Sequence, residues 1–302
     1  MTTPSGHILF DRAQLARHRD RAARTFQDYA VLKQRESTEL LDRLQDVSRQ
    51  FDVALDLGCH DGTAALGLLK SGQVQTVIGL ERSAALAQKA RGSGVPTVQG
   101  DEEALPFSPS SFDLVTSILS LHWINDLPGS LIQLRRCLKP DGLFLGCLFG
   151  GGTLSELRVS LLEAETELTG GAAARLSPLP GLQDMAGLLQ RAGFALPVVD
   201  REAVTIRYGD PLQLIADLKG TGEQTAFARQ PGTPRRPLSA GLISRMCEIY
   251  RDRFSDPDGK VRASFEIIWL SGWAPSPSQP QPLKPGTPSQ SLADAVRGRR
   301  TS

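Results

Sequence analysis

Residues 53–63 read VALDLGCHDGT, and this stretch decides the fold. Its apolar first half lacks the alternation of a half-exposed strand, which is typical of a parallel strand covered on both faces. Gly58 and Gly62 then allow a sharp turn and a close approach of the backbone to a ligand. The following TAALGLLKS, from Thr63, predicts a helix whose free N–H groups face the space above the turn. Together these elements predict the first nucleotide-binding unit of a doubly wound α/β sheet.

The turn differs from the dinucleotide-binding fingerprint G-x-G-x-x-G, because His60 and Thr63 stand where that motif needs glycine. It resembles the D-x-G-C-G-x-G turn of S-adenosylmethionine (SAM)-dependent methyltransferases, with His60 in place of the middle glycine. Histidine is one of the few residue types that tolerate a positive φ, so the turn can form. An ordinary strand-to-helix turn explains these residues equally well, and the turn alone leaves both interpretations open.

Strands and helices alternate along the chain as far as residue 149. Further strands are expected at 76–81, 96–100, 112–118 and 143–149, and two more at 194–208 and 263–273. The last two are expected to form an antiparallel edge. The pattern predicts an α/β fold with a doubly wound, mostly parallel, Rossmann-like sheet of seven strands, as in class I SAM-dependent methyltransferases.

Three regions are expected: an N-terminal helical segment (1–50), a SAM-binding domain (51–273) with a helical insertion at 210–262, and a disordered Pro/Ser/Gln-rich tail (274–302). The charged helix within 8–34 either covers the cofactor cleft or is peripheral, and its charge favours the peripheral interpretation. Residues 220–237 are either a lid or a surface excursion. Thr153 and Glu156 predict a capping box for the helix that follows them.

The composition indicates an ordinary soluble globular protein: 302 residues, 40% hydrophobic, with a formal net charge of +1. Such a balanced charge argues against a nucleic-acid partner. Four scattered cysteines without a C-x-x-C pair predict free thiols in a reducing compartment. No apolar run is long enough to cross a bilayer, and the N-terminus carries no signal core or clear presequence. We therefore expect a cytoplasmic protein, or a mitochondrial matrix protein in a eukaryote.

Carboxylates follow the first three strands, at the edge where open α/β sheets bind ligands. Asp56 closes the first strand, and Glu81 ends the second, where a carboxylate can accept hydrogen bonds from ribose hydroxyls. Asp101, beside Glu102, follows the third strand and is placed to accept a hydrogen bond from an adenine amino group. A surface glutamate and an acidic helix start are the alternatives. For Glu81, position and residue type together favour ligand binding.

The fourth strand brings Ser117 and the residues after it to the same edge of the sheet. His122 is suited to take a proton from an acceptor that must lose one, since its ordinary pKa lies near 6.5. A packed ring at a strand end is the alternative for His122, and a core aromatic is the alternative for Trp123. We predict that both side chains line the pocket.

Several motifs together resemble a known branch of methyltransferases: FDR (10–12), DLGC (56–59), DEEALPF (101–107), FDLV (112–115), SLHWINDLP (120–128), LKPDG (138–142), FGGGTLSELR (149–158) and RAGF (191–194). The chain resembles class I SAM-dependent methyltransferases and, within them, the methyltransferase-like assembly factor of respiratory complex I that is described as an arginine hydroxylase. It is more distantly similar to the malonyl-acyl-carrier-protein O-methyltransferase of biotin synthesis. The likeness spans about residues 8–273.

The resemblance implies SAM as the cofactor and hydroxylation of an arginine in an iron–sulfur subunit of complex I, which would be the partner. His122 and Trp123 are then the catalytic candidates, beside the reacting carbon. The candidate cofactor-binding residues are Asp56, Gly58, Cys59, His60, Gly62, Glu81, Asp101, Glu102 and Ser117.

Hydroxylation normally needs a redox cofactor or a metal, for which two histidines and one carboxylate are the usual protein ligands of iron. His60 and His122 with Asp101 or Glu102 can reach one sheet edge, but such a set also arises by chance, and we assign no metal site. Three functions remain open: an arginine-modifying assembly enzyme, a methyltransferase acting on a carboxylate or other small acceptor, and a SAM-binding assembly chaperone without turnover.

Overall fold

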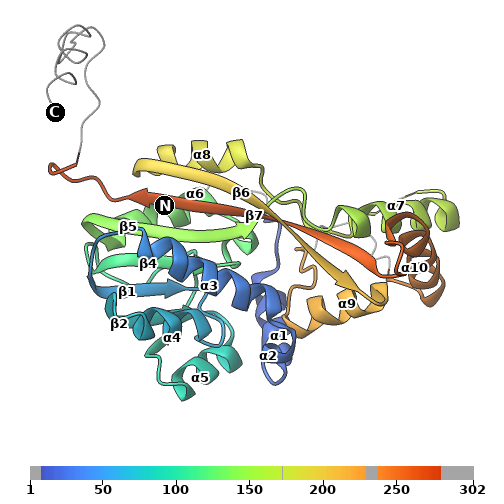
Figure 1. Ribbon diagram of the computed structural model, residues 1–302, viewed down its shortest axis with the longest axis horizontal. Helices are drawn as coiled ribbons and strands as arrows, with labels where there is room; N and C mark the ends of the chain where they lie inside the picture. Colours follow the sequence, from blue (N-terminus) through green and yellow to red (C-terminus); the bar gives the residue numbers. More distant parts are fainter. Residues whose placement is uncertain (1–7, 172, 229–236, 280–302) are drawn as a thin grey trace, which may run out of the picture.

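The computed structural model describes residues 8–171, 173–228 and 237–279, which form one mixed sheet covered by helices (Figure 1). The strand order is β3-β2-β1-β4-β5-β7-β6. The strands are β1 (Phe51–Leu57), β2 (Val74–Glu81), β3 (Thr97–Gln99), β4 (Phe112–Ile118), β5 (Leu138–Phe149), β6 (Ala195–Tyr208) and β7 (Val261–Trp273). The predicted Rossmann-like sheet of seven strands is confirmed.

The first five strands run parallel, and β7 pairs antiparallel with both β5 and β6. Asp56 pairs in register with Gly79 of β2 and with Thr116 of β4. The carboxyl ends of β1, β2 and β4 therefore lie at one edge, where the strand order reverses and where such sheets bind ligands.

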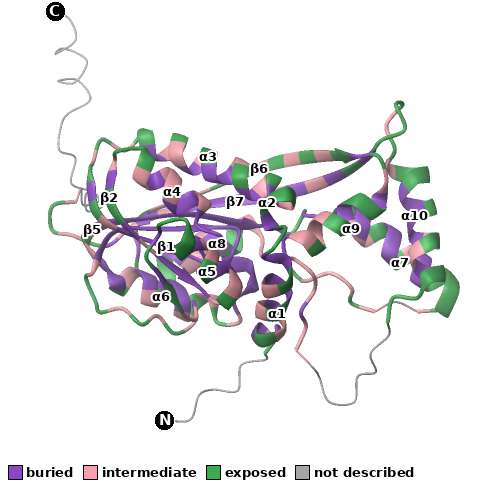
Figure 2. Ribbon diagram, turned by 90° about the horizontal axis from the view of Figure 1, so that it is seen from below, coloured by how far each residue is buried: buried purple, intermediate pink, exposed green. Residues whose placement is uncertain are grey.

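Two separate apolar cores hold helices on the two faces of the sheet, because parallel strands must be covered on both sides. Figure 2 shows the inner strands as a buried band between helices whose outer faces are exposed, whereas the edge strand β6 is mostly intermediate or exposed. The helices are α1 (Arg12–Ala22), α2 (Phe26–Tyr29), α3 (Val31–Gln45), α4 (Thr63–Lys70), α5 (Ala84–Gly92), α6 (Leu127–Cys137), α7 (Ser155–Thr169), α8 (Leu182–Arg191), α9 (Pro211–Gly220) and α10 (Ala240–Phe254).

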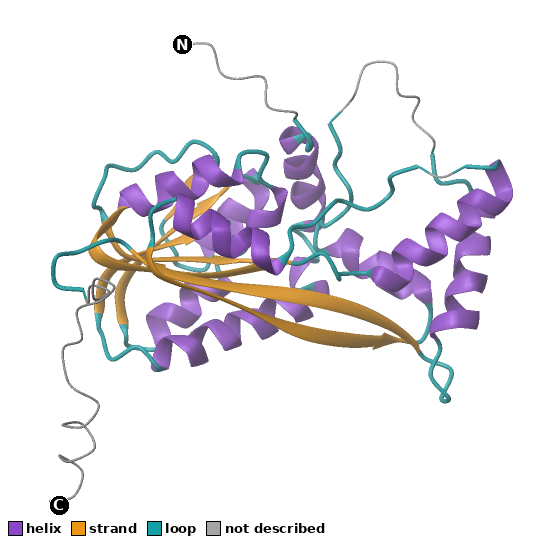
Figure 3. Cartoon of the chain, turned by 90° about the horizontal axis from the view of Figure 1, so that it is seen from above, coloured by secondary structure: helices purple, strands orange, loops and turns teal. Residues whose placement is uncertain are grey.

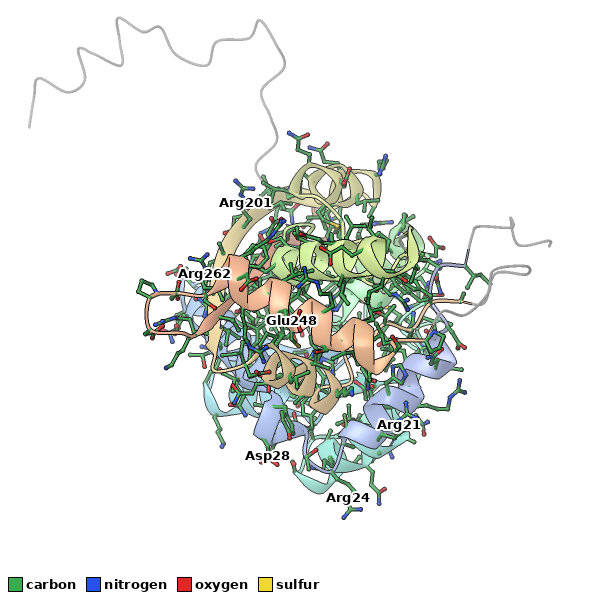
Figure 4. The ribbon with its side chains drawn as sticks, turned by 90° about the vertical axis from the view of Figure 1, so that its right-hand side faces the viewer. Arg21, Arg24, Asp28, Arg201, Glu248 and Arg262 are labelled. Carbon is green, nitrogen blue, oxygen red and sulfur yellow. The ribbon has the colours of Figure 1, made fainter. Side chains whose placement is uncertain are left out.

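A long antiparallel ribbon, β6 with β7, extends beyond the parallel part of the sheet toward α7 and α10 (Figure 3). The predicted insertion between these strands contains α9 and α10. α10 packs along α7 at this end of the molecule, which Figure 4 shows from outside, with Glu248 of α10 on its surface. α9 lies nearer the parallel sheet and contacts α1 and α2.

Two local predictions are wrong. Thr153 and Glu156 form no capping box, because Thr153 bonds the backbone of Glu266 in β7 and Glu156 accepts from Ser264. Leu154 instead starts α7 from a left-handed conformation, with φ of 55°. β5 begins at Leu138 rather than at residue 143, and its pairing with β4 is irregular between Leu138 and Leu143.

Most of the predicted disordered tail, from residue 280 on, and residues 229–236 of the expected lid or surface excursion lie outside the described residues. All four cysteines are free and buried. No helix in the described ranges is long and apolar enough to cross a membrane.

Candidate functional site

The loop between β1 and α4 adopts the tight turn that its glycines predict. Gly58, His60 and Gly62 all have positive φ, at 65°, 51° and 87°. His60 thus takes the left-handed conformation that the sequence required of it. Its backbone N–H donates to Glu81 Oε2 at 3.0 Å, so the turn is fixed to the end of β2.

The side chain of His60 is buried and packs against Phe26, with ring centroids 5.6 Å apart. Its Nε2 lies 3.1 Å from Lys33 Nζ and 3.2 Å from the carbonyl oxygen of Ile118. Burial lowers the pKa of His60 well below its ordinary value, and the charges of Lys33 and Arg19 lower it further. The imidazole is therefore neutral at neutral pH.

Glu81 lies at the sheet edge and faces the turn, as predicted. The residue is fully buried, and its carboxylate accepts hydrogen bonds from the backbone N–H groups of His60 and Ser83. Burial raises the pKa of this carboxyl, while the nearby guanidinium of Arg19, 3.7 Å away, opposes the rise.

Asp56 is buried beside the turn. Its Oδ1 accepts from Thr116 Oγ1 at 3.1 Å, and its Oδ2 has no hydrogen-bond partner among the described residues. Burial is the main cause that raises the pKa of Asp56 to about 7. A buried carboxylate oxygen without a partner is unusual, and it marks a place where a ligand donor would be stabilised.

The N-terminal helix α1 covers this edge, which corrects the expectation of a peripheral helix. Arg12 makes ion pairs with Glu102 and Glu103 and lies 3.1 Å from Asp101. Arg19 is only 1% exposed and lies between Glu81 and Glu102, at 3.7 and 4.0 Å. Arginines in a charged helix usually face solvent, and here two of them neutralise the carboxylates of the site.

The guanidinium of Arg19 is incompletely satisfied, because its Nε and Nη2 have no hydrogen-bond partner in the described part of the chain. Buried guanidinium nitrogens prefer a carboxylate or phosphate acceptor, which Arg can bind through two parallel hydrogen bonds. The site therefore provides carboxylates that can accept from a ligand's donors. It also provides the unpartnered Nε and Nη2 of Arg19, which can donate to an anionic group.

Asp101 is engaged by protein groups. It pairs with Arg82 and Arg12 and accepts the backbone N–H of Glu103. Although burial opposes it, these contacts lower the pKa of Asp101.

A second cluster joins α3, the end of β4 and residues 221–228. Lys33 Nζ, almost fully buried, donates to Glu223 Oε1 at 2.8 Å and to the carbonyl oxygen of Leu119 at 3.0 Å. Leu119 itself has a φ of 48°, rare for leucine. Glu223 also accepts from Trp123 Nε1 and contacts His122 Nε2 at 3.2 Å. We name these four side chains, Lys33, His122, Trp123 and Glu223, the Glu223 cluster.

Charges in the Glu223 cluster are balanced. Burial alone would raise the pKa of Glu223, but Lys33 and His122 hold it well below its usual range. Burial lowers the pKa of His122 despite its glutamate partner. A neutral His122 donates through Nε2 to Glu223, so the lone pair is on Nδ1, which has no partner in the described residues.

Two hollows lie beside these clusters. The first has a volume of about 320 Å³ and is lined by Phe26, Ala30, Lys33, Gln34, Ser37, Asp56, Gly58, Cys59, His60, Asp61, Thr63, Ala64 and Ile118. The second, of about 430 Å³, is bordered by α2, α3, α9, β6 and β7. Lys33 lines both, so they are neighbours.

The predicted residues therefore divide into groups. Asp56, Gly58, Cys59 and His60 line the first hollow. Glu81 and Glu102 lie behind it under α1, and Gly62 packs against Ala90 and Val95. Ser117 Oγ donates to the carbonyl oxygen of Leu57 inside the sheet, which holds it away from the hollow's lining. Within the described ranges, no group of three or more His, Cys, Asp or Glu residues is arranged to hold a metal ion.

Comparison with known proteins identifies the family. A model described as "Methyltransferase domain" matches residues 55–146. The chain is 39% identical to "Arginine-hydroxylase NDUFAF5, mitochondrial" of Danio rerio, over 96% of this chain and 90% of the relative. The human protein of the same name is 38% identical over 97% of this chain and 85% of the relative. The chain belongs to the NDUFAF5 family. It is a methyltransferase-fold enzyme that resembles the complex I assembly factor.

Relatives of this NDUFAF5-family chain extend to a second activity. The "Malonyl-[acyl-carrier protein] O-methyltransferase" of Halorhodospira halophila is 34% identical over 89% of this chain and 90% of the relative. Among solved structures, a putative methyltransferase from Bacillus halodurans has a TM-score of 0.55 at 18% identity, covering 79% of this chain and all of its own. At that identity the match shows the fold alone.

Sequence reasoning missed three functional candidates: Arg19, Lys33 and Glu223. Arg19 and Lys33 stand in helices that read as charged and solvated, and Glu223 stands in a stretch punctuated by glycine. Their burial depends on contacts between residues far apart in the sequence, so no local pattern indicates them. The FDR motif (10–12), which contains Arg12, was the one local signal that this helix belongs to the site.

Proposed function

We propose that the chain binds SAM in the first hollow and hydroxylates an arginine side chain of an iron–sulfur subunit of complex I. The observation that carries this proposal is the 39% identity, over almost the whole chain, to a relative named for arginine hydroxylation. The chemistry of the site supports it, since Asp56 and the backbone of Gly58 line the hollow, and Glu81 and Arg19 lie behind it.

The residues fit the cofactor at both of its ends. Asp56, with one oxygen unpartnered, and Glu81 are suited to accept from the ligand's hydroxyl and ammonium groups. The two unpartnered nitrogens of Arg19 are suited to a carboxylate. The backbone of Gly58 lies in the lining, where no side chain blocks a ligand. When bound, SAM supplies a sulfonium-activated methyl group.

The side chains near the Glu223 cluster would position the acceptor. His122 is buried and neutral, and its Nδ1 is available to take a proton. Trp123 contacts Phe10 edge-on at 5.1 Å, so it joins the N-terminal segment to the cluster. Contrary to the prediction, neither residue belongs to the lining of the two hollows. Both bond to Glu223, which lines the second hollow, and we place the reacting group beside that carboxylate.

A second candidate function is methylation of a carboxylate, favoured by the 34% identity to a malonyl-carrier-protein O-methyltransferase. Methyl transfer needs little beyond correct placement of the acceptor. Both candidates require the same SAM site, so the product distinguishes them.

The experiment combines the purified full-length chain, SAM and an iron–sulfur subunit of complex I from the same source. Molecular oxygen and a two-electron reductant are supplied, because hydroxylation consumes both, and the peptides are then analysed by mass. Gain of one oxygen atom on an arginine supports hydroxylation, and gain of one methyl group supports the second candidate. SAM binding without any mass change would overturn both and leave an assembly role without turnover. We also propose a cytoplasmic location, which cell fractionation tests.

A further inference from the structure

The second hollow has the composition of a cation pocket. Four aromatic rings line it, from Tyr29, Phe149, Tyr208 and Phe265, together with the carboxylates of Asp217 and Glu223. Val31, also in the lining, is 62% exposed and marks the outer rim.

The charges in this hollow do not cancel. Lys33 and Glu223 form an ion pair at 2.8 Å, which leaves Asp217 as the additional carboxylate of the lining. Asp217 Oδ2 accepts one hydrogen bond, from Tyr208 OH at 2.9 Å. Burial raises the pKa of Asp217, so a cation placed here would stabilise its charged form.

The aromatic walls suit a flat cation. Arg guanidinium groups stack on aromatic faces and bind carboxylates through planar pairs of hydrogen bonds, whereas a lysine ammonium is compact and strongly hydrated. The ring of Tyr29 lies directly against Gly220, at the end of the helix that carries Asp217. The carboxylate and this ring both line the hollow.

Lys33 connects this hollow to the first one, and His122 packs on the ring of Phe149, 4.8 Å between centroids. A side chain that enters past Val31 therefore ends beside the Glu223 cluster and next to the proposed cofactor hollow.

We propose that the second hollow receives the guanidinium group of the acceptor arginine, with Asp217 as its carboxylate partner and Tyr29 as a stacking wall. This inference rests on the proposed function, for which it supplies the acceptor site. It also makes a claim about binding that does not depend on which group is transferred.

The test is a calorimetric titration of the full chain with Nα-acetyl-L-arginine amide and with the matching citrulline amide, which has the same shape without the charge. We expect the arginine probe to bind about tenfold more tightly than citrulline, and Asp217→Asn to remove that preference. Asp42→Asn, an exposed aspartate on α3, is the matched control and should bind like the parent. Equal affinity for the two probes, or an Asp217→Asn variant with the parent's preference, would overturn the proposal.

A second variant covers the case in which Asp217→Asn fails to fold, as judged by its unfolding midpoint. Tyr29→Leu keeps the apolar contact with Gly220 but removes the stacking face, and it should weaken arginine binding several-fold. Undiminished affinity in this variant would count against the proposal. Titration with S-adenosylhomocysteine in the same samples separates the two claims. If the parent does not bind S-adenosylhomocysteine, the cofactor site is refuted. If the parent binds it but shows no preference for the arginine probe, only the acceptor site is refuted.

Discussion

Breaking the Lys33–Glu223 ion pair from one side should destabilise the fold strongly, and Lys33→Met tests this. The substitution keeps most of the side-chain volume and removes three contacts of Nζ, to Glu223 Oε1, the carbonyl oxygen of Leu119 and His60 Nε2. Glu223 would remain buried as a carboxylate without its cation. Breaking one partner of a buried pair costs about 3–5 kcal/mol.

We expect a loss of about 3 kcal/mol, at the lower end of that range. Glu223 keeps two donors, His122 Nε2 and Trp123 Nε1, which still partly stabilise its charge. The double variant Lys33→Met/Glu223→Gln should lose less than the sum of the single variants, because neither then leaves a buried charge unpaired.

Urea unfolding followed by circular dichroism measures the effect, with the denaturant slope expected to be unchanged. Arg245→Met, which breaks the surface pair with Glu167, is the control and should leave the midpoint unchanged. The reasoning is refuted if Lys33→Met costs less than about 1 kcal/mol, or if the two single effects simply add.

The pH dependence of the same pair has a definite sign. The folded-state pKa of Glu223 lies well below its unfolded value, so its stabilisation is present above about pH 4 and is lost as the pH falls through the folded pKa. Lys33→Met has less of this stabilisation to lose. The deficit of the variant relative to the parent should therefore shrink in acid.

Three further substitutions test the cofactor edge. Asp56→Asn should gain stability relative to the parent as the pH rises from about 4 to 7, because the folded carboxyl, with a pKa of about 7, keeps a proton that the unfolded chain releases; parallel curves would contradict this. Gly58→Ala should lower the unfolding midpoint more than Gly72→Ala, since both residues have positive φ but only at Gly58 would a Cβ lie 2.2 Å from a serine hydroxyl; equal shifts would show that the close contact is unimportant. Arg19→Met should weaken S-adenosylhomocysteine binding about tenfold, as measured by calorimetry. Arg17, on the same helix, has a side chain that is 62% exposed, and Arg17→Met should leave the affinity unchanged. Unchanged affinity in Arg19→Met would exclude that guanidinium from the site.

The sheet and its turn could be predicted from the sequence because their signals are local. A run such as VALDL reports burial on both faces, and glycines at 58 and 62 report positive φ, so the edge that carries Asp56 and Glu81 follows from strand order alone. The capping box failed for the opposite reason, since Thr153 bonds a strand more than a hundred residues away.

The residues that close the site could not be predicted in this way. Arg12 and Glu102 are 90 positions apart, and Lys33 and Glu223 are 190 apart. In the sequence, each is an ordinary charge whose default is exposure to solvent. Only the folded chain shows that the sheet edge concentrates carboxylates and that α1 and α3 supply the cations that neutralise them.

The two segments that cover the site, α1 and residues 221–228, are joined to one another. Phe10 forms a bridge with Phe227, Asp11 N–H donates to the carbonyl oxygen of Ala226, and Trp123 packs in the same small apolar cluster as Phe10. α1 carries Arg19 against Glu81 at the sheet edge, and residues 221–228 carry Glu223, which lines the second hollow. Because these segments share backbone hydrogen bonds and an apolar contact, displacing one disturbs the other.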